Sequence, residues 1–285
     1  MAFDLARIPN RLKSAYRDNR CAILVGAGAS AGAGLPSWGE FLGHMIDQAL
    51  DHGVISDDKA NEYRLLVADP GKYLMAAAGL KDDMSAYFDE FIEEVFVAPA
   101  PKPSDLHRAI TGSDRLQFVL TTNYDMLLEL TYREAGKHDV SVCTFTDAGE
   151  IHRRLSKREF FILKAHGDAS RVGNGIVLTE LDYRSIIHRH RAYQSLLSAM
   201  FTMFTIVFVG VSMSDPDIKI LLSQIGDAYS ENAGPSHFAL MAEDDVTNVE
   251  KERWLRDMKV QIIPVSRADD YKEVTEFMQA LHTVV

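Results

Sequence analysis

The stretch that decides the fold is Cys21-Ala-Ile-Leu-Val-Gly-Ala-Gly-Ala-Ser-Ala-Gly-Ala-Gly34. Its first five residues are all apolar, which indicates a short buried strand, and the glycines that follow indicate a tight turn. Such a turn can bind a pyrophosphate, because we expect Gly26, Gly28 and the helix behind them to provide free backbone N–H groups and to allow a close approach. The turn alone is a weak signal, since it can also serve simply as a tight connection.

Helical patterns flank this stretch on both sides. Upstream, apolar residues at helical spacing predict an amphipathic helix over residues 5–16. Downstream, Ser37 with Glu40 three residues later forms a capping box, which predicts a helix that begins there. The first strand is therefore followed by a turn and a helix.

Residues 51–103 show no strand-like alternation. We expect helices near Asp57–Val67, 72–80 and 84–97, and therefore an all-helical insert over 51–103. The insert ends at Pro99-Ala-Pro-Lys-Pro103, because proline cannot continue a helix. Ser104 is then expected to cap a short helix.

From Leu116 onward, apolar strand patterns alternate with helical patterns. The expected strands of the whole chain are Cys21–Val25, Leu116–Thr121, 140–145, 160–165, Thr205–Val209, His237–Ala242 and Val260–Val265. The expected helices after Leu116 are 124–135, 182–203, 216–228, 246–258 and 270–281. Runs that are apolar throughout are typical of parallel strands buried on both faces. The pattern predicts an α/β fold, a doubly wound, Rossmann-like and mostly parallel sheet that carries the helical insert.

Length and composition suit one soluble domain. The 285 residues, of which 47% are hydrophobic and 25% charged, predict a single domain over 1–285 with 51–103 as its insert. A formal charge of −11 gives no overall field that would attract nucleic acid or an anionic membrane. Cys21 and Cys143 lie in apolar patterns, as expected of reduced thiols. With no signal-peptide pattern and no apolar run long enough to cross a bilayer, we expect a cytoplasmic protein.

Polar or glycine-rich motifs follow four of the expected strands. They are Gly26-Ala-Gly-Ala-Ser30, Thr122-Asn-Tyr-Asp125, His166-Gly-Asp168 and Gly210-Val-Ser-Met-Ser-Asp215. In a doubly wound sheet, ligands bind at the carboxyl ends of the strands. We therefore expect these four motifs to meet at one site.

Each motif also has a simpler interpretation. Asn123 and Asp125 can be turn residues that cap the next helix, and His166 can be a core histidine. Gly28-Ala-Ser-Ala-Gly32 matches the nucleophile elbow of serine hydrolases, but that elbow follows central strands, whereas only one strand precedes this segment. A dehydrogenase is disfavoured too, because the turn leads into helices rather than into a strand that ends in an acidic residue.

Taken together, the motifs resemble the ordered motif set of the sirtuins over residues 20–225. The matching segments are Gly26-Ala-Gly-Ala-Ser30, Gly34-Leu-Pro36, Thr121-Thr-Asn-Tyr-Asp125, His166-Gly167 and Gly210-Val-Ser212. The sequence is more similar still to the sirtuin-like NAD+ hydrolases of bacterial anti-phage defence, a stand-alone sirtuin-like domain as in HerA-associated or Thoeris-type systems. The segments behind that likeness are Trp38 after Pro36, His166-Gly-Asp168, Val177-Leu-Thr-Glu-Leu-Asp-Tyr183 and Ser-x-x-Asp-Pro at 212–216.

Two departures from the deacylating sirtuins stand out. Their zinc ribbon needs four cysteines, and this sequence has two. Their Asp-Phe-Arg after the proline is replaced by Ser37-Trp-Gly39. His188 and His190 lie in an arginine-rich stretch that we interpret as the solvated face of a helix, so we assign no metal.

The resemblance implies a role for each motif residue. Asn123 would position the nicotinamide ribose and the attacking water, His166 would act as general base, and Asp125 would orient the polar cluster. Gly26, Gly28 and Ser30 would line the diphosphate, and Gly210 with Ser212 would meet the adenosine ribose. The other residues that we expect to contact NAD+ are Ala27, Pro36, Trp38, Thr122 and Asp215. Because nicotinamide leaves as a neutral group from a cationic ring, no strong general acid is needed.

The resemblance therefore implies an NAD+ glycohydrolase that releases nicotinamide and ADP-ribose, with NAD+ as substrate and no metal, acting as an NAD+-depleting effector of anti-phage defence. A zinc-free protein deacylase and a non-catalytic NAD+ or ADP-ribose binding module remain open as alternatives. Because a cell could not tolerate unrestrained NAD+ loss, we expect a homo-oligomer or control by a partner, such as a HerA-like ATPase or another defence protein. We expect no direct contact with nucleic acid or membrane.

Overall fold

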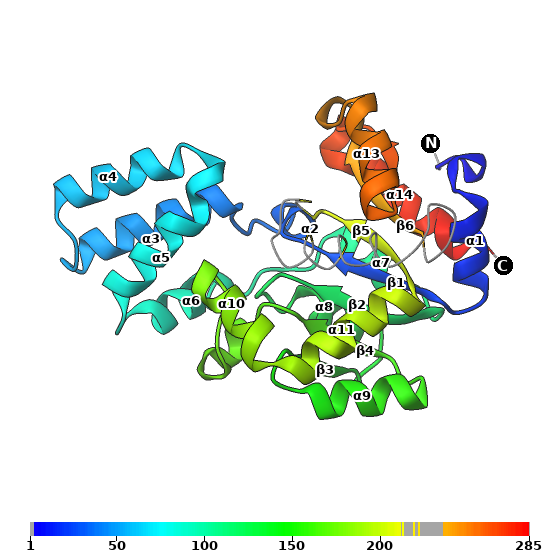
Figure 1. Cartoon of the computed structure of the whole chain (residues 1–285), viewed down its shortest axis with the longest axis horizontal. Helices are drawn as coiled ribbons and strands as arrows, with labels where there is room; N and C mark the ends of the chain where they lie inside the picture. The colour runs from blue at the N-terminus through cyan, green and yellow to red at the C-terminus, as the bar shows by residue number, and fades with distance from the viewer. Residues whose placement is uncertain (1–2, 212, 214–218, 220–221, 223–235, 285) are drawn as a thin grey trace.

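The computed structural model describes residues 3–211, 213, 219, 222 and 236–284. Within this part, a sheet of seven strands forms the centre of the molecule (Figure 1). The strands are β1 (Cys21–Val25), β2 (Leu116–Thr121), β3 (Ser141–Thr144), β4 (Phe161–Lys164), β5 (Thr205–Val209), β6 (His237–Ala242) and β7 (Val260–Val265). Their order is β3-β4-β2-β1-β5-β6-β7, and all the described pairings are parallel. The predicted Rossmann-like α/β fold is confirmed.

Helices cover both faces of the sheet. Cys21, Ile23 and Val25 of β1 point into one apolar core, whereas Ala22 and Leu24 point into the other. The α-helices are α1 (Asn10–Arg17), α2 (Gly28–Ala31), α3 (Trp38–Asp51), α4 (Asp57–Val67), α5 (Tyr73–Met84), α6 (Phe88–Phe96), α7 (Asp105–Thr111), α8 (Leu127–Glu134), α9 (Ala148–Lys157), α10 (Glu180–Arg189), α11 (Arg191–Met203), α13 (Asn248–Met258) and α14 (Ala268–His282). Short 3-10 helices are η1 (Leu5–Arg7), η2 (Pro70–Lys72), η3 (Ala169–Asn174) and η4 (Glu243–Asp245). In the described part of the chain, no helix has both the length and the apolar character needed to cross a bilayer.

The chain changes direction across the sheet at β1. It runs from β1 to β2, β3 and β4 on one side and then returns to β5 on the other side of β1. Val25 pairs with Thr121 and with Val209, and Thr121 pairs with Lys164, so β1, β2, β4 and β5 end level with one another. A ligand site is expected at such a topological switch point.

Helices α3 to α6 form a separate apolar cluster beside the sheet (Figure 1). Ser37 caps α3 as predicted, because its hydroxyl accepts from the N–H of Glu40 while the Glu40 carboxylate accepts from the N–H of Ser37. The cluster also contains Tyr124 and Leu178, which come from the loops beyond β2 and β4. The helical part therefore packs against the carboxyl edge of the sheet. How the chain divides into domains stays a prediction.

Some helices differ from those predicted. The helix expected over 182–203 is two helices, α10 and α11, because the backbone at His190 is not helical (φ −105°, ψ 53°) and its ring packs edge-on against Phe145 at 5.0 Å. Helix α8 begins three residues later than expected, since Asn123 and Asp125 belong to a loop. Helix α9 was not predicted; it is short, and its apolar face consists of Ile151 with the partly buried Ala148 and Leu155 in an otherwise polar segment. The helix expected over 216–228 lies outside the described residues.

Backbone packing between β1 and β5 explains the glycines of the turn. A Cβ on Gly26 would lie 2.6 Å from the carbonyl oxygen of Gly210, and a Cβ on Gly28 would lie 3.0 Å from the same atom. Gly210 itself has φ +62°, and its own Cβ would lie 2.5 Å from the nitrogen of Ala29. The turn after β1 therefore packs directly on the turn after β5.

Replacing Gly26 by Ala should lower the free energy of unfolding by about 1–3 kcal/mol, because the new methyl group meets backbone atoms that cannot move aside. Gly43→Ala is the matched control, since nothing lies within 4 Å of a Cβ there. Inside α3, that substitution should be neutral or stabilise by about 0.5–1 kcal/mol. Urea unfolding measures both variants, and an unchanged midpoint for Gly26→Ala would contradict this packing.

Candidate functional site

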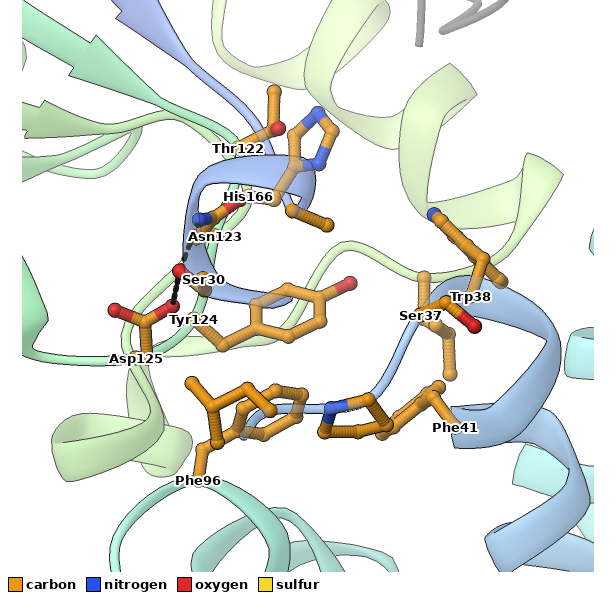
Figure 2. Close-up of a pocket in the computed structure, with 14 residues that line it drawn as sticks. Ser30, Ser37, Trp38, Phe41, Phe96, Thr122, Asn123, Tyr124, Asp125 and His166 are labelled. Atoms are coloured by element: carbon orange, nitrogen blue, oxygen red, sulfur yellow. Dashed lines mark hydrogen bonds between the residues drawn. The ribbon is translucent and has the colours of Figure 1, made fainter. Parts of the chain in front are cut away.

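A pocket lies where the carboxyl edge of the sheet meets the helical cluster (Figure 2). Its lining residues are Ala27, Ser30, Leu35, Pro36, Ser37, Trp38, Phe41, Phe96, Thr122, Asn123, Tyr124, Asp125, His166 and Leu178. Of the expected site residues, the pocket brings together Ala27, Ser30, Pro36, Trp38, Thr122, Asn123, Asp125 and His166. Motifs from three strand ends and from the start of α3 thus converge.

Asn123 is held rigidly by the ends of two strands. Its backbone N–H donates to Thr121 Oγ1 at 3.0 Å, and that hydroxyl donates to the carbonyl of Val25 at 2.9 Å. Its side-chain Nδ2 donates to the carbonyl of Gly26 at 3.1 Å and to Ser30 Oγ at 2.9 Å. The side chain therefore bridges the loop after β2 and the turn after β1.

The carboxamide oxygen of Asn123 has no hydrogen-bond partner among the residues that the structure describes. The carbonyl of Gly26 can only accept, so Nδ2 must face it and the orientation of the amide is fixed. Oδ1 is one of four buried side-chain polar atoms without a hydrogen-bond partner among the described residues, and the others belong to residues that do not line the pocket. Since a buried acceptor without a donor is costly, Oδ1 is suited to accept from a ligand or water.

Asp125 and Ser30 complete a chain of hydrogen bonds behind Asn123. Asp125 Oδ2 accepts from Ser30 Oγ at 2.8 Å, and its Oδ1 accepts from the N–H of Leu127 at 2.9 Å. The hydroxyl of Ser30 therefore links the Asp125 carboxylate to the Asn123 amide (Figure 2). Since this hydroxyl already donates to Asp125, it is not a free donor for a phosphate.

A buried histidine that the sequence analysis did not single out lies near Asp125. His107 on α7 is 1% exposed, and its Nδ1 lies 2.8 Å from Ser104 Oγ. Burial lowers the pKa of His107, although the negative charge of Asp125 opposes this shift. In the sequence, the one indication of His107 is its place three residues after the expected cap Ser104, where a side chain can complete the cap.

His166 follows β4 and is 5% exposed. Its ring packs edge-on against Tyr183 of α10, with ring centroids 5.3 Å apart. The next residue must be glycine, because Gly167 has φ +97° and a Cβ there would lie 2.3 Å from the carbonyl oxygen of Gly175. His166 and Asn123 therefore line one pocket from neighbouring strands, β4 and β2.

Aromatic rings form the wall opposite these polar groups. Trp38 stacks on Tyr73 at 6.0 Å, and Phe96 contacts both Phe41 at 5.5 Å and Tyr124 at 5.4 Å. The sequence analysis found Trp38 but not Phe41, Phe96 or Tyr124 as pocket residues. Phe96 belongs to α6, and nothing in the sequence says that this helix lies beside the strand ends.

The expectation of free N–H groups at Gly26 and Gly28 is wrong. Gly26 donates to the carbonyl of Val209 at 3.0 Å, and Gly28 donates to that of Gly210 at 2.9 Å. Both N–H groups already donate hydrogen bonds, because the end of β5 and the turn after it lie so close to the turn after β1. Ala27 between them lines the pocket, and its N–H has no acceptor among the described residues.

Three of the other predicted residues, Gly26, Gly28 and Gly210, do not line the pocket. Ser212 and Asp215 are outside the described residues. No group of three or more potential metal ligands occurs in the described part of the chain. Both cysteines are buried, and burial raises the pKa of the Cys21 thiol to about 12.

Lys164 is a further residue that the sequence analysis missed. It ends β4, and its side chain is fully buried beside the carboxylates of Glu129 and Asp168. Burial lowers the pKa of Lys164, but Glu129 and Asp168 more than reverse the effect, so the pKa is raised and the side chain stays charged. A lysine that ends an apolar strand was the available signal in the sequence.

Comparisons with known proteins agree with this geometry. A family model described as a SIR2-like domain matches residues 117–263, a little more than half of the chain. A protein of Enterococcus faecium named NAD(+) hydrolase ThsA is 28% identical over 290 residues, which cover 95% of this chain and 57% of that protein. The protein of the same name from Bacillus cereus (strain MSX-D12) is 26% identical, with 93% and 54% covered.

A protein of Bacillus subtilis named Defense-associated sirtuin 2 is 25% identical over 211 residues, which cover 73% of this chain and 19% of that protein. The chain spans about half the length of the two relatives named NAD(+) hydrolase ThsA. Because the family model covers more than half of the chain, and its match includes the strands that carry Asn123 and His166, the chain belongs to the SIR2-like family.

Proposed function

We propose that this chain binds NAD+ in the pocket and hydrolyses the bond between nicotinamide and ribose. The observation that carries the proposal is the unpartnered Oδ1 of Asn123 in the same pocket as the ring of His166. The names of the relatives, NAD(+) hydrolase ThsA, support NAD+ as the substrate. Products would be nicotinamide, ADP-ribose and a proton.

In the proposed reaction, water forms a bond to the ribose carbon as the bond to the nicotinamide nitrogen breaks. The electron pair of the broken bond neutralises the pyridinium ring, so the leaving group needs no proton. The ribose passes through an oxocarbenium-like transition state. Asn123 Oδ1 accepts from a ribose hydroxyl or from the water, and His166 takes the proton that the water loses.

The rest of the pocket would bind and enclose the substrate. We place the diphosphate at the N–H of Ala27 and the nicotinamide against the aromatic wall of Trp38, Phe41 and Phe96. Gly210, with Ser212 and Asp215, would meet the adenosine ribose. Asp125 would act through Ser30 by keeping the Asn123 amide in one orientation.

The setting that we propose is anti-phage defence, where loss of NAD+ would stop the infected cell. The name of the Bacillus subtilis relative, Defense-associated sirtuin 2, supports this setting. We propose a cytoplasmic protein that acts as a homo-oligomer, or under the control of a partner such as a HerA-like ATPase or another defence protein. Restraint of this kind is required because free NAD+ hydrolysis would harm the host.

His166→Ala should lower the rate of nicotinamide release by about 100-fold to 10,000-fold, because a general base contributes that much. NAD+ binding should persist, since the diphosphate contacts lie elsewhere. Asn123→Ala should weaken both binding and turnover. Nicotinamide release by chromatography and NAD+ binding by calorimetry measure the two effects.

The matched controls are His188→Ala and Asn61→Ala, which change exposed residues of α10 and α4. A folded His166→Ala variant with wild-type turnover would remove His166 from the mechanism. Stoichiometric binding of NAD+ by the wild type without release would favour a binding module instead. Release only in the presence of an acyl-lysine peptide would favour a protein deacylase.

A strong chelator should leave both nicotinamide release and the melting temperature unchanged. The reason is that the sequence has two cysteines, too few for a zinc ribbon, and the proposed chemistry needs no metal. Thermal unfolding and turnover with and without EDTA make the test. If EDTA lowered the melting temperature and added zinc restored it, the protein would contain a structural metal, and the expectation that it needs no metal would be wrong.

A further inference from the structure

Lys164 joins the two loops that carry Asn123 and His166. Its Nζ donates to the carbonyls of Tyr124 at 3.0 Å and Asp125 at 2.6 Å, in the loop after β2. The same Nζ donates to Asp168 Oδ1 at 3.0 Å, in the loop after β4. One ammonium group therefore binds the residues that directly follow Asn123 and the residue two positions after His166.

Asp168 extends this connection along the second loop. Its Oδ1 also accepts from the N–H of Ser170 at 3.0 Å and from its hydroxyl at 2.8 Å, while Oδ2 accepts from Arg171 Nε at 3.0 Å. The N–H of Ala169 donates to the carbonyl of Tyr124 at 3.0 Å. The loop after β4 is thus fixed to the loop after β2 through this charged centre and this backbone hydrogen bond, and also through the hydroxyl of Tyr124, which donates to the carbonyl of Val177 at 2.6 Å.

The ammonium group of Lys164 stays charged, although burying it costs free energy. The side chain of Lys164 has no solvent exposure, and Glu129 Oε1 lies 3.1 Å from Nζ, although burial raises the pKa of Glu129 in spite of this contact. Although burial raises the pKa of Asp168, Lys164 and Ser170 more than reverse the effect, so the pKa is lowered and the pair stays ionised. Replacing a whole buried ion pair by well-packed apolar residues is often neutral or stabilising, so a buried pair is weak evidence for a purely stabilising role.

We propose that Lys164 is a positioning residue, which fixes the distance and orientation between Asn123 and His166 by binding both of their loops. Lys164 does not itself line the pocket, and it acts on Asn123 and His166 only through their loops. Reaction rates depend steeply on such geometry, since a displacement of about 1 Å can cost roughly 100-fold. The kinetic part of this inference rests on the proposed NAD+ hydrolysis.

Lys164→Met removes the ammonium and keeps a chain of similar length. It should lower kcat by about 10-fold to 100-fold through misplaced groups. KM for NAD+ should stay within about 3-fold, because Lys164 does not line the pocket and the variant keeps every side chain that does. Glu129→Gln is the matched control: it removes a contact of the same ammonium that reaches neither loop, so kcat should be nearly unchanged.

Both variants should lower Tm, because Lys164→Met removes the ammonium beside the buried carboxyl groups of Glu129 and Asp168, and Glu129→Gln removes one of those two groups. Kinetics are therefore compared at a temperature where both proteins are folded. If Lys164→Met keeps a wild-type kcat, or if both variants lose kcat to the same degree, Lys164 serves only stability and the inference is wrong. Should Lys164→Met fail to fold, Asp168→Asn tests the same link with nearly unchanged volume, and a wild-type kcat there would also overturn it.

A second measurement does not depend on activity. In protein labelled with 13C-histidine, the ring signals of His166 should shift in Lys164→Met and stay in place in Glu129→Gln. The signals of exposed His188 should stay in place in both. Unmoved His166 signals in Lys164→Met would overturn the inference. If the wild type releases no nicotinamide, the proposed function fails while this spectrum still tests the role of Lys164.

Discussion

The level ends of β1, β2, β4 and β5 are the constraint on which the rest of the site depends. Val25 pairs with Thr121 and Val209, and Thr121 pairs with Lys164. Only because β1 and β2 end together can Asn123 reach the carbonyl of Gly26 from the neighbouring strand. A slip of one residue would exchange the side chains of β1 between the two cores and break this contact, so the apolar pattern that forms the sheet also assembles the site.

The polar groups of the site hold one another in place through hydrogen bonds. The amide nitrogen of Asn123 donates to two atoms of the protein, and the hydroxyl of Ser30 donates to Asp125. Both carboxylate oxygens of Asp125 accept hydrogen bonds from the protein. In the described part of the chain, Asn123 Oδ1 has no hydrogen-bond partner, and it is fixed in place before any ligand arrives. A group that is already oriented needs no rearrangement during the reaction, which is how a polar pocket lowers a barrier. The surrounding aromatic rings keep the local dielectric low and strengthen such contacts.

Sequence patterns were enough for the sheet, because buried parallel strands are apolar throughout and end in recognisable motifs. They were also enough to name Asn123, Asp125 and His166, which follow strands that must end at one edge. They failed where the cause is contact between distant segments: the break at His190, the approach of Gly210 that uses the N–H groups of Gly26 and Gly28, and the position of Phe96. Lys164 escaped notice because a single lysine in a sequence does not show that it is buried.

The central claim is that Asn123 Oδ1 and His166 face the nicotinamide ribose of NAD+. A crystal structure of the His166→Ala variant with NAD+ tests it most directly, since slow turnover would keep the substrate intact. The account predicts a ribose hydroxyl or an ordered water about 2.7–3.2 Å from Asn123 Oδ1, with the nicotinamide against Trp38, Phe41 and Phe96. NAD+ bound with its nicotinamide ribose outside this pocket, and Asn123 Oδ1 still without a donor, would contradict it.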